Sequence, residues 1–321
     1  MSLCVYVIVN GVKDGIENWS KIMMPIIIVL LLVLAIRGLT LPGGIDGLKF
    51  LFLPRFDELT ASAIVLALGH SFFTLSLGMG TMITYGSYLN KKQNLLNSAL
   101  WVIALDTAIA LLAGTAIFTS VFAAGADPDG GPGLIFYILP SIFPQLAYGA
   151  IWGTLFFTLL FMAALTSAIS ILEVVTAYFI DQKGWSRNRA TIQFGAIITI
   201  VGVFCSLSMG WSPEQQEQFK GLNIAEYFGS SFQHYLGDTF FDLMDNLSSK
   251  YMLPFGGMMT AIFILVRWGV PSFLSEFGGD KLDSERNRLV VTILCFIAAG
   301  VAGFILLNEL IETITGNAII G

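Results

Sequence analysis

The sequence predicts an all-α protein that crosses a membrane several times. Of its 321 residues, 55% are apolar and 12% are charged, and this charged share is about half of that in a soluble domain (roughly 25%). Several apolar stretches reach the ~20 residues that a helix needs to cross a bilayer. Because so few charges cannot cover a soluble globule of this length, we expect a lipid bilayer to surround part of the protein.

The composition also excludes other classes of protein. The net charge is −6 and no basic run is longer than Lys91-Lys92, so the sequence lacks the basic stripe that nucleic-acid binding requires. The three cysteines, Cys4, Cys205 and Cys295, are isolated and lie in or beside apolar stretches. They predict neither a disulfide framework nor a metal site.

The first apolar stretch, residues 1–12, is too short to cross a bilayer as a helix, because a helix rises only ~1.5 Å per residue. No basic region precedes it and no small-residue cleavage site follows it, so it does not have the pattern of a signal peptide. We interpret it as the second half of a helix.

Seven longer apolar stretches are predicted to span the membrane. They cover residues 23–41, 59–88, 95–124, 150–180, 190–211, 240–268 and 289–307. Between the third and the fourth stretch, residues 125–147 begin with a turn-rich acidic segment and continue with an apolar run that is too short to span. We expect this segment to be an outer loop that contains a re-entrant or surface hairpin.

The lysines and arginines predict the orientation of the spans, because cytoplasmic loops carry an excess of these residues. Eleven of the 16 lie on one side of the predicted spans and the other five lie on the opposite side. The richer side is predicted to be cytoplasmic. This places the N-terminal stretch inside and the C-terminus outside in a cell (inner) membrane.

Two polar features within the spans are candidates for binding, because polar groups are costly inside a bilayer. Glycines and hydroxyl residues within 69–80 predict unwinding near 76–78, which exposes carbonyl groups to a cation or a substrate. The alternative is close helix packing through small residues, and for His70 we expect a structural hydrogen bond. Asp106 costs roughly 2.5–3.5 kcal/mol to insert, so a cation, a proton or neighbouring hydroxyls such as that of Thr107 must compensate its charge.

Further polar residues lie in two later spans, 150–180 and 240–268. Thr166 and Ser167 are surrounded by small residues, and hydroxyl oxygens suit a hard cation such as Na⁺. Such hydroxyls also bond back to their own helix, which is the alternative. Glu173 is another carboxylate within the same span. Near the outer end of the sixth span, Asp242 and Asp245 either close a gate by pairing with a basic residue or lie at the membrane interface.

Long motifs in the expected order give the sequence a resemblance to the neurotransmitter:sodium symporter family, in its bacterial amino-acid transporter branch. FFTLSLGMG followed by TYGSYLNKKQNLL resembles the sixth helix of that family and the loop after it. LLFMAALTSAISILEVVTAYFID is similar to helix eight, and TFFDLMDNLSSKYMLPFGG is similar to helix ten. GIENWSKIMMP resembles the start of helix five, and GPGLIFYILPSIFPQ resembles the fourth extracellular loop.

The resemblance implies part of an inverted-repeat sodium symporter fold. Residues 1–12 would be a stub of helix four, and the seven spans would be helices five to eleven, with helices six to ten forming a complete second repeat. Residues 125–147 would be the fourth extracellular loop. The resemblance therefore implies that the sequence is truncated at the N-terminus, without helices one to three and half of helix four.

The resemblance also implies the functional residues. Thr74 and Asp106 would hold the first sodium ion, while the Ala163 carbonyl and the hydroxyls of Thr166 and Ser167 would hold the second. The carboxylate of Asp106 implies that chloride is not required. Asp245 matches the acidic residue of the outer gate, and Gly15 and Pro25 match the unwinding site of helix five. The positions that match the substrate pocket are Phe73, Thr74, Ser76, Met79, Ser167 and Ile171.

The implied function is sodium-coupled symport of a neutral, apolar or aromatic amino acid by alternating access. The alternatives are a truncated product that does not transport and one half of a split transporter, whose missing N-terminal helices form a separate chain. An enzyme within the membrane that uses His70 and Asp106 is not indicated, because the sequence contains no nucleophile motif and no HExxH.

Overall fold

The computed structural model describes residues 1–90, 93–128, 134–209, 239–278 and 284–315. All regular secondary structure in these ranges is helical. Residues 129–133 of the predicted loop and residues 210 and 211 at the end of a predicted span lie outside them. The described residues divide into two compact units, which we describe separately.

Six helical stretches among the described residues are long and apolar enough to cross a membrane. They are Val12–Leu39, Leu95–Ala123, Gly149–Lys183, Arg187–Met209, Phe240–Trp268 and Glu285–Thr315. The prediction of a multi-pass all-α protein is therefore confirmed. The predicted span 59–88 is not among the six, because it is interrupted between Thr74 and Thr81.

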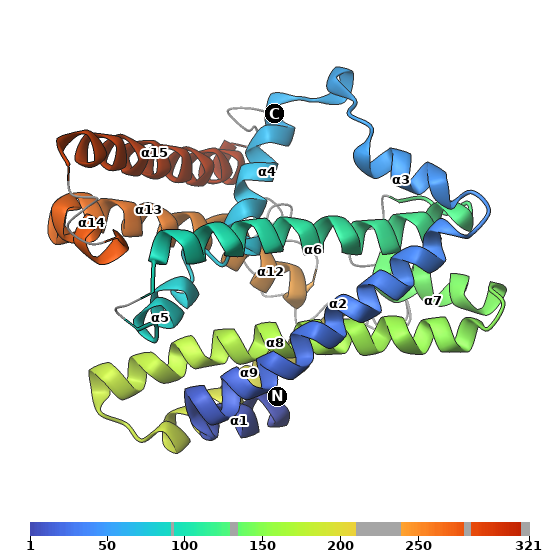
Figure 1. Cartoon of the computed structure of the whole chain (residues 1–321), viewed down its shortest axis with the longest axis horizontal. Helices are drawn as coiled ribbons and strands as arrows, with labels where there is room; N and C mark the ends of the chain where they lie inside the picture. The colour runs from blue at the N-terminus through green and yellow to red at the C-terminus, as the bar shows by residue number, and fades with distance from the viewer. Residues whose placement is uncertain (91–92, 129–133, 210–238, 279–283, 316–321) are drawn as a thin grey trace. The chain divides into compact units, whose positions relative to one another are not determined.

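The first unit contains residues Met1–Asp57 and Ile103–Gly195. In this unit, α2 lies across α8 (Figure 1), and the two helices are in contact. Their apolar side chains form a core together with α6, α7 and the segment before α7. The helices that begin in this unit are α1 (Ser2–Val9), α2 (Asn18–Leu39), α3 (Gly44–Phe52), α7 (Leu139–Ile142), α8 (Gly149–Lys183) and α9 (Arg187–Met209). Most of α6 (Leu95–Ala123) belongs here too.

The second unit contains residues Glu58–Val102 and Ala196–Gly321. Its most extensive contact is between α13 and α15, which lie side by side (Figure 1). The predicted span 240–268 is a continuous helical path in which π-helical turns, Leu247–Met252 and Ile264–Trp268, follow α12 and α13. The helices of this unit are α4 (Ala61–Thr74), α5 (Thr81–Ser87), α12 (Phe240–Asn246), α13 (Leu253–Phe263), α14 (Val270–Gly278) and α15 (Glu285–Thr315).

The chain is unwound between α4 and α5, over residues 75–80, and we call this segment the break. Ser76, Gly78 and Gly80 have φ angles of 54°, 80° and 85°, a left-handed conformation that no helix continues. A Cβ atom at Gly78 would overlap the carbonyl oxygen of Leu253 in α13. The break therefore packs with its backbone directly against the backbone of α13, and glycine at 78 permits both the conformation and the close approach.

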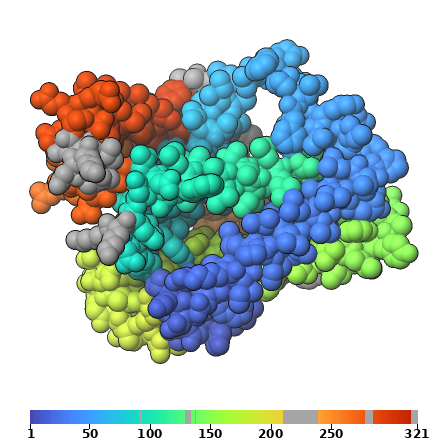
Figure 2. All heavy atoms as spheres, viewed as in Figure 1, coloured from blue at the N-terminus to red at the C-terminus, as the bar shows by residue number. Residues whose placement is uncertain are grey.

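Large apolar side chains are exposed along α2, which lies at the visible surface in blue in Figure 2. They include Ile22, Ile26, Val29, Leu32, Val33 and Ile36. An exposed apolar face of this length is unfavourable in water. It is stable when lipid or further protein covers it.

Candidate functional site

The break and the last turn of α4 bring four of the predicted substrate residues together. Phe73 and Thr74 end α4, and Ser76 and Met79 lie in the break. Phe73 is 53% exposed, whereas the other three residues are half-buried. The break thus presents one exposed aromatic ring beside backbone that is not part of a helix.

The predicted residues of the second sodium site lie together on α8. Ala163 and Ser167 are one turn apart on this helix, and Ile171 follows one turn later. The hydroxyl of Thr166 donates to the carbonyl oxygen of Ala163 at 2.8 Å. This is the bond back to its own helix that the alternative interpretation of the hydroxyl expects, and a sodium site at these residues stays a prediction.

Asp106 lies on α6 in the first unit, whereas Thr74 belongs to the second unit. Asp106 is half-buried. The hydroxyl of the neighbouring Thr107 donates to the carbonyl oxygen of Ile103 at 2.9 Å, so its only proton is used within its own helix. The predicted first sodium site thus takes one residue from each unit, and the predicted substrate residues also come from both.

The two acidic residues near the start of α12 have different surroundings. The Asp242 carboxylate accepts from the Thr239 backbone N–H, and the Asp242 N–H donates to the Thr239 hydroxyl, both at 3.0 Å. This reciprocal pair is a capping box that starts the helix. Asp245 is exposed on the next turn. Of the two carboxylates, Asp245 is therefore the one that is not used to cap the helix.

Gly15 and Pro25 lie in a helical stretch. Gly15 is in the π-helical turn Val12–Glu17, where an added Cβ would overlap the carbonyl oxygen of Val7. Pro25 lies inside α2. The chain is helical from one residue to the other, so unwinding between them stays a prediction.

A hollow of about 740 Å³ lies between α8 and the segment before it, within the first unit. Its walls are mainly apolar, as is usual for small-molecule sites. None of the predicted sodium or substrate residues lines it. The lining residues are Pro140, Phe143, Pro144, Gly149, Ala150, Gly153, Thr154, Phe157, Thr158 and Phe161.

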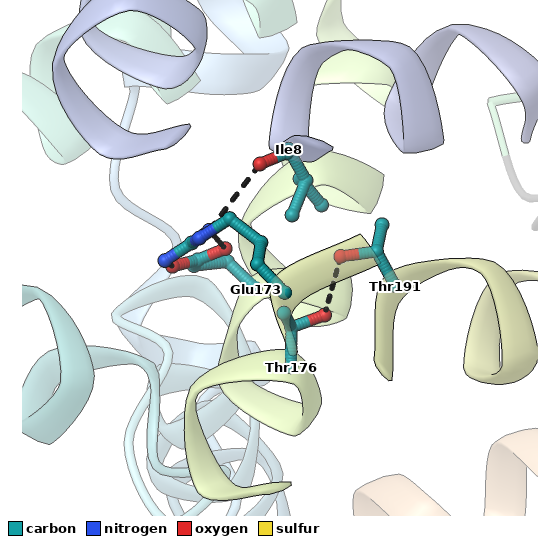
Figure 3. Close-up of polar contacts among 5 residues, drawn as sticks. Ile8, Glu173, Thr176 and Thr191 are labelled. Atoms are coloured by element: carbon teal, nitrogen blue, oxygen red, sulfur yellow. Dashed lines mark hydrogen bonds and ion pairs between the residues drawn. The ribbon is translucent and has the colours of Figure 1, made fainter. Parts of the chain in front are cut away.

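A polar cluster that sequence reasoning did not assemble connects α1, α8 and α9 (Figure 3). The guanidinium of Arg187 donates to both carboxylate oxygens of Glu173, at 2.8 and 3.0 Å, and to the carbonyl oxygen of Ile8 at 3.3 Å. Beside this ion pair, the hydroxyls of Thr176 and Thr191 lie 3.4 Å apart. Glu173 is fully buried, and the bidentate pair compensates its charge.

The sequence profile of the sodium:neurotransmitter symporter family matches residues 1–215 of this chain. Among curated proteins, the chain is 38% identical over 276 residues to the uncharacterized sodium-dependent transporter YhdH of Bacillus subtilis (strain 168). This similarity covers 86% of this chain and 57% of that protein. An uncharacterized sodium-dependent transporter of Haemophilus influenzae is 34% identical over 266 residues, which cover 81% of this chain and 54% of that protein.

Among solved structures, the chain resembles the crystal structure of MhsT in complex with L-phenylalanine, with a TM-score of 0.79 and 42% sequence identity. This similarity covers 96% of this chain and 66% of the MhsT chain. The described helices therefore have the fold of the corresponding part of MhsT. The chain spans between half and two-thirds of the length of these relatives.

Proposed function

The chain belongs to the sodium:neurotransmitter symporter family, and from this premise we propose that it forms part of a sodium-coupled symporter for a neutral, apolar or aromatic amino acid. The observation that carries the proposal is the break at 75–80, with Phe73, Thr74, Ser76 and Met79 at or next to it. An interrupted helix within a membrane span supplies backbone groups that bind the charged ends of a substrate or an ion. The Phe73 ring supplies an apolar contact for its side chain.

Phenylalanine is the first substrate to test. The solved structure of MhsT, which shares the fold, contains L-phenylalanine. The aromatic ring of Phe73 and the thioether of Met79 favour an apolar or aromatic side chain, because both make favourable contacts with aromatic rings.

For sodium we propose two sites, Thr74 with Asp106 and Ala163 with Thr166 and Ser167. The oxygen donors at these positions are carboxylate, hydroxyl and carbonyl groups, which suit a hard monovalent cation. Bound sodium stabilises the arrangement of helices that binds the amino acid, so each ligand raises the affinity for the other. Because Asp106 supplies a fixed negative charge, we propose that chloride is not required.

We further propose that α4 to α9, together with α12 and α13, belong to the second of two inverted repeats. In this proposal α1 and α2 belong to the first repeat, and α15 follows both. Asp245, exposed on α12, is then the acidic member of an outer gate. The loops that are rich in Lys and Arg lie in the cytoplasm. Gly15, in the π-helical turn Val12–Glu17, and Pro25, in α2, mark the helical segment that unwinds during transport.

A second candidate function is that this chain does not transport on its own. It spans 57% of the length of YhdH, and its apolar face along α2 is exposed. In this case, the chain is a non-transporting product or one half of a split transporter whose other half supplies the remaining helices.

Uptake into proteoliposomes tests the proposed function. Vesicles that contain the purified chain are loaded with potassium and diluted into sodium or choline buffer with radiolabelled phenylalanine. If this chain transports, phenylalanine should accumulate in the vesicles. The accumulation should require sodium, should be independent of chloride and should be abolished in Asp106→Ala. Sodium-independent uptake would contradict the proposal, and binding without uptake would favour the second candidate.

A further inference from the structure

The break rests on a part of the predicted span 240–268 that follows a π-helical turn. In the break, Gly78 packs against the carbonyl oxygen of Leu253 and against the backbone of Gly256. Leu253 is the first residue of α13, and the residues directly before it form the π-helical turn Leu247–Met252. The position of this turn therefore determines where the carbonyl lies against which the break packs.

The hydrogen bonding of the span is weaker at this turn. Proline has no backbone N–H, so the usual α-helical hydrogen bond from Pro254 to the carbonyl oxygen of Lys250 cannot form. The hydroxyls of Ser248 and Ser249 both donate to the carbonyl oxygen of Asp245, at 3.0 and 2.6 Å, so they bind the turn only to its own helix. Because π-helical turns within longer helices often lie at functional sites, the contacts of this turn with neighbouring helices are of interest.

Two side chains of the π-helical turn contact the same part of α15. The Nζ atom of Lys250 lies 3.9 Å from a carboxylate oxygen of Glu309, whose side chain is 12% exposed. The hydroxyl of the next residue, Tyr251, forms a hydrogen bond with the hydroxyl of Thr313. Thr313 donates its own proton to the carbonyl oxygen of Glu309 at 2.7 Å, so Tyr251 is the donor in the bond between the two hydroxyls. An ion pair and a hydrogen bond thus join the turn to Glu309 and Thr313, which are one helical turn apart.

The positive charge that faces Glu309 comes from the π-helical turn. A carboxylate within a helix that is apolar enough to span a membrane is unfavourable unless its charge is compensated. The helices α4, α13 and α14, which also contact α15, contain no Lys or Arg. Arg267, on the same span as Lys250, lies 17 residues further along the chain. The electrostatic attraction of Glu309 is therefore directed at the turn.

We propose that Glu309 is a positioning residue for the proposed amino-acid site. Through Lys250 it holds the π-helical turn, and with it the Leu253 carbonyl, in the place where the break packs. The proposal rests on the proposed function, since the site that Glu309 positions is the one at the break. In this proposal, α15 carries none of the residues that bind the amino acid or sodium, yet it contributes to the affinity of the site.

The test compares Glu309→Gln and Lys250→Met, which each remove one charge of the pair, with the variant that combines them. Glu312→Gln is the matched control, because it makes the same change one turn later on α15 and keeps the ion pair. Tyr251→Phe removes the second contact without changing a charge, so it tests the same turn even where a charge variant does not fold. The melting temperature without amino acid and the Kd for phenylalanine at a fixed sodium concentration are measured for each purified full-length variant.

We expect the Kd for phenylalanine to rise about three- to fivefold in Glu309→Gln and in Lys250→Met, as for the loss of a partly exposed ion pair. The combined variant should have about the same Kd as either single variant, because the two residues act through one contact. Tyr251→Phe should raise the Kd about threefold or more, whereas Glu312→Gln should stay within about twofold of wild type. A residue that only stabilises the fold would lower the melting temperature and leave the Kd unchanged.

Two results would overturn the inference alone. One is a wild-type Kd in both single charge variants or, where these do not fold, in Tyr251→Phe. The other is a combined variant whose Kd rises by the product of the two single effects, about ninefold or more, since the two residues would then act separately. A wild-type chain that does not bind phenylalanine in sodium would contradict the proposed function as well as the inference.

Discussion

At the scale of single residues, the ion pair of Glu173 and Arg187 shows what a sequence does not reveal. The sequence identifies Glu173 as a carboxylate within a predicted span, where a charge is unfavourable, and Arg187 as one of the basic residues that predict the orientation of the spans. Hydropathy and charge counts do not pair residues across a turn between two helices. In the structure, Arg187 begins α9 and its guanidinium reaches both Glu173 in α8 and the last turn of α1.

Breaking this pair should destabilise the protein strongly. The Glu173 side chain is fully buried and that of Arg187 is 26% exposed. Arg187→Met removes the cation that pairs with this buried carboxylate, at a cost of about 3–5 kcal/mol. The double variant Glu173→Met/Arg187→Met removes both charges and should recover most of the loss. Melting curves in detergent measure both effects.

The exposed pair of Lys49 and Asp46 provides the control, because its side chains are 63% and 62% exposed. Lys49→Met should change the free energy of unfolding by less than about 1 kcal/mol. A double variant at 173 and 187 that is no more stable than Arg187→Met would show that the two residues do not compensate each other.

At the scale of elements, the glycines and hydroxyls of residues 69–80 predicted an interrupted helix near 76–78, and the chain is unwound over 75–80. The pattern did not reveal which neighbour fixes the break. The break contacts α13 because the backbones of Gly78 and Gly256 pack closely together, although more than 170 residues separate them in the sequence. The same limit applies to the π-helical turns that follow α12 and α13, which hydropathy does not distinguish from α-helix.

A methyl group at Gly78 should open the break and weaken ligand binding. Gly78 has a φ of 80°, and a Cβ there overlaps the Leu253 carbonyl oxygen, so Gly78→Ala combines an unfavourable backbone conformation with a steric clash. We expect a loss of about 2 kcal/mol or more in stability and a weaker affinity for phenylalanine. Thermal melting and equilibrium binding measure these two losses.

Gly86→Ala is the matched control in α5, because a Cβ there has open space around it. This variant should be neutral or should stabilise the helix by about 0.5–1 kcal/mol. Equal destabilisation by both substitutions would contradict the role that we assign to the contact between the break and α13.

At the scale of the whole molecule, composition alone predicted a multi-pass all-α membrane protein, and the six apolar helices and the similarity to MhsT confirm this. The motifs predicted the family, which the family profile confirms. The predicted binding residues fall on two separate compact units, with Phe73 and Thr74 in one and Ser167 in the other. Local sequence patterns identify each group but do not determine how distant segments meet.

The proposed function requires that this chain carries an amino-acid site whose affinity depends on sodium. Equilibrium binding of radiolabelled phenylalanine to the purified chain, in sodium and in an equal concentration of potassium, tests this requirement. Coupling between the two ligands predicts a Kd about 5–150-fold lower in sodium. The same Kd in both salts, or no binding in either, would contradict the proposed function.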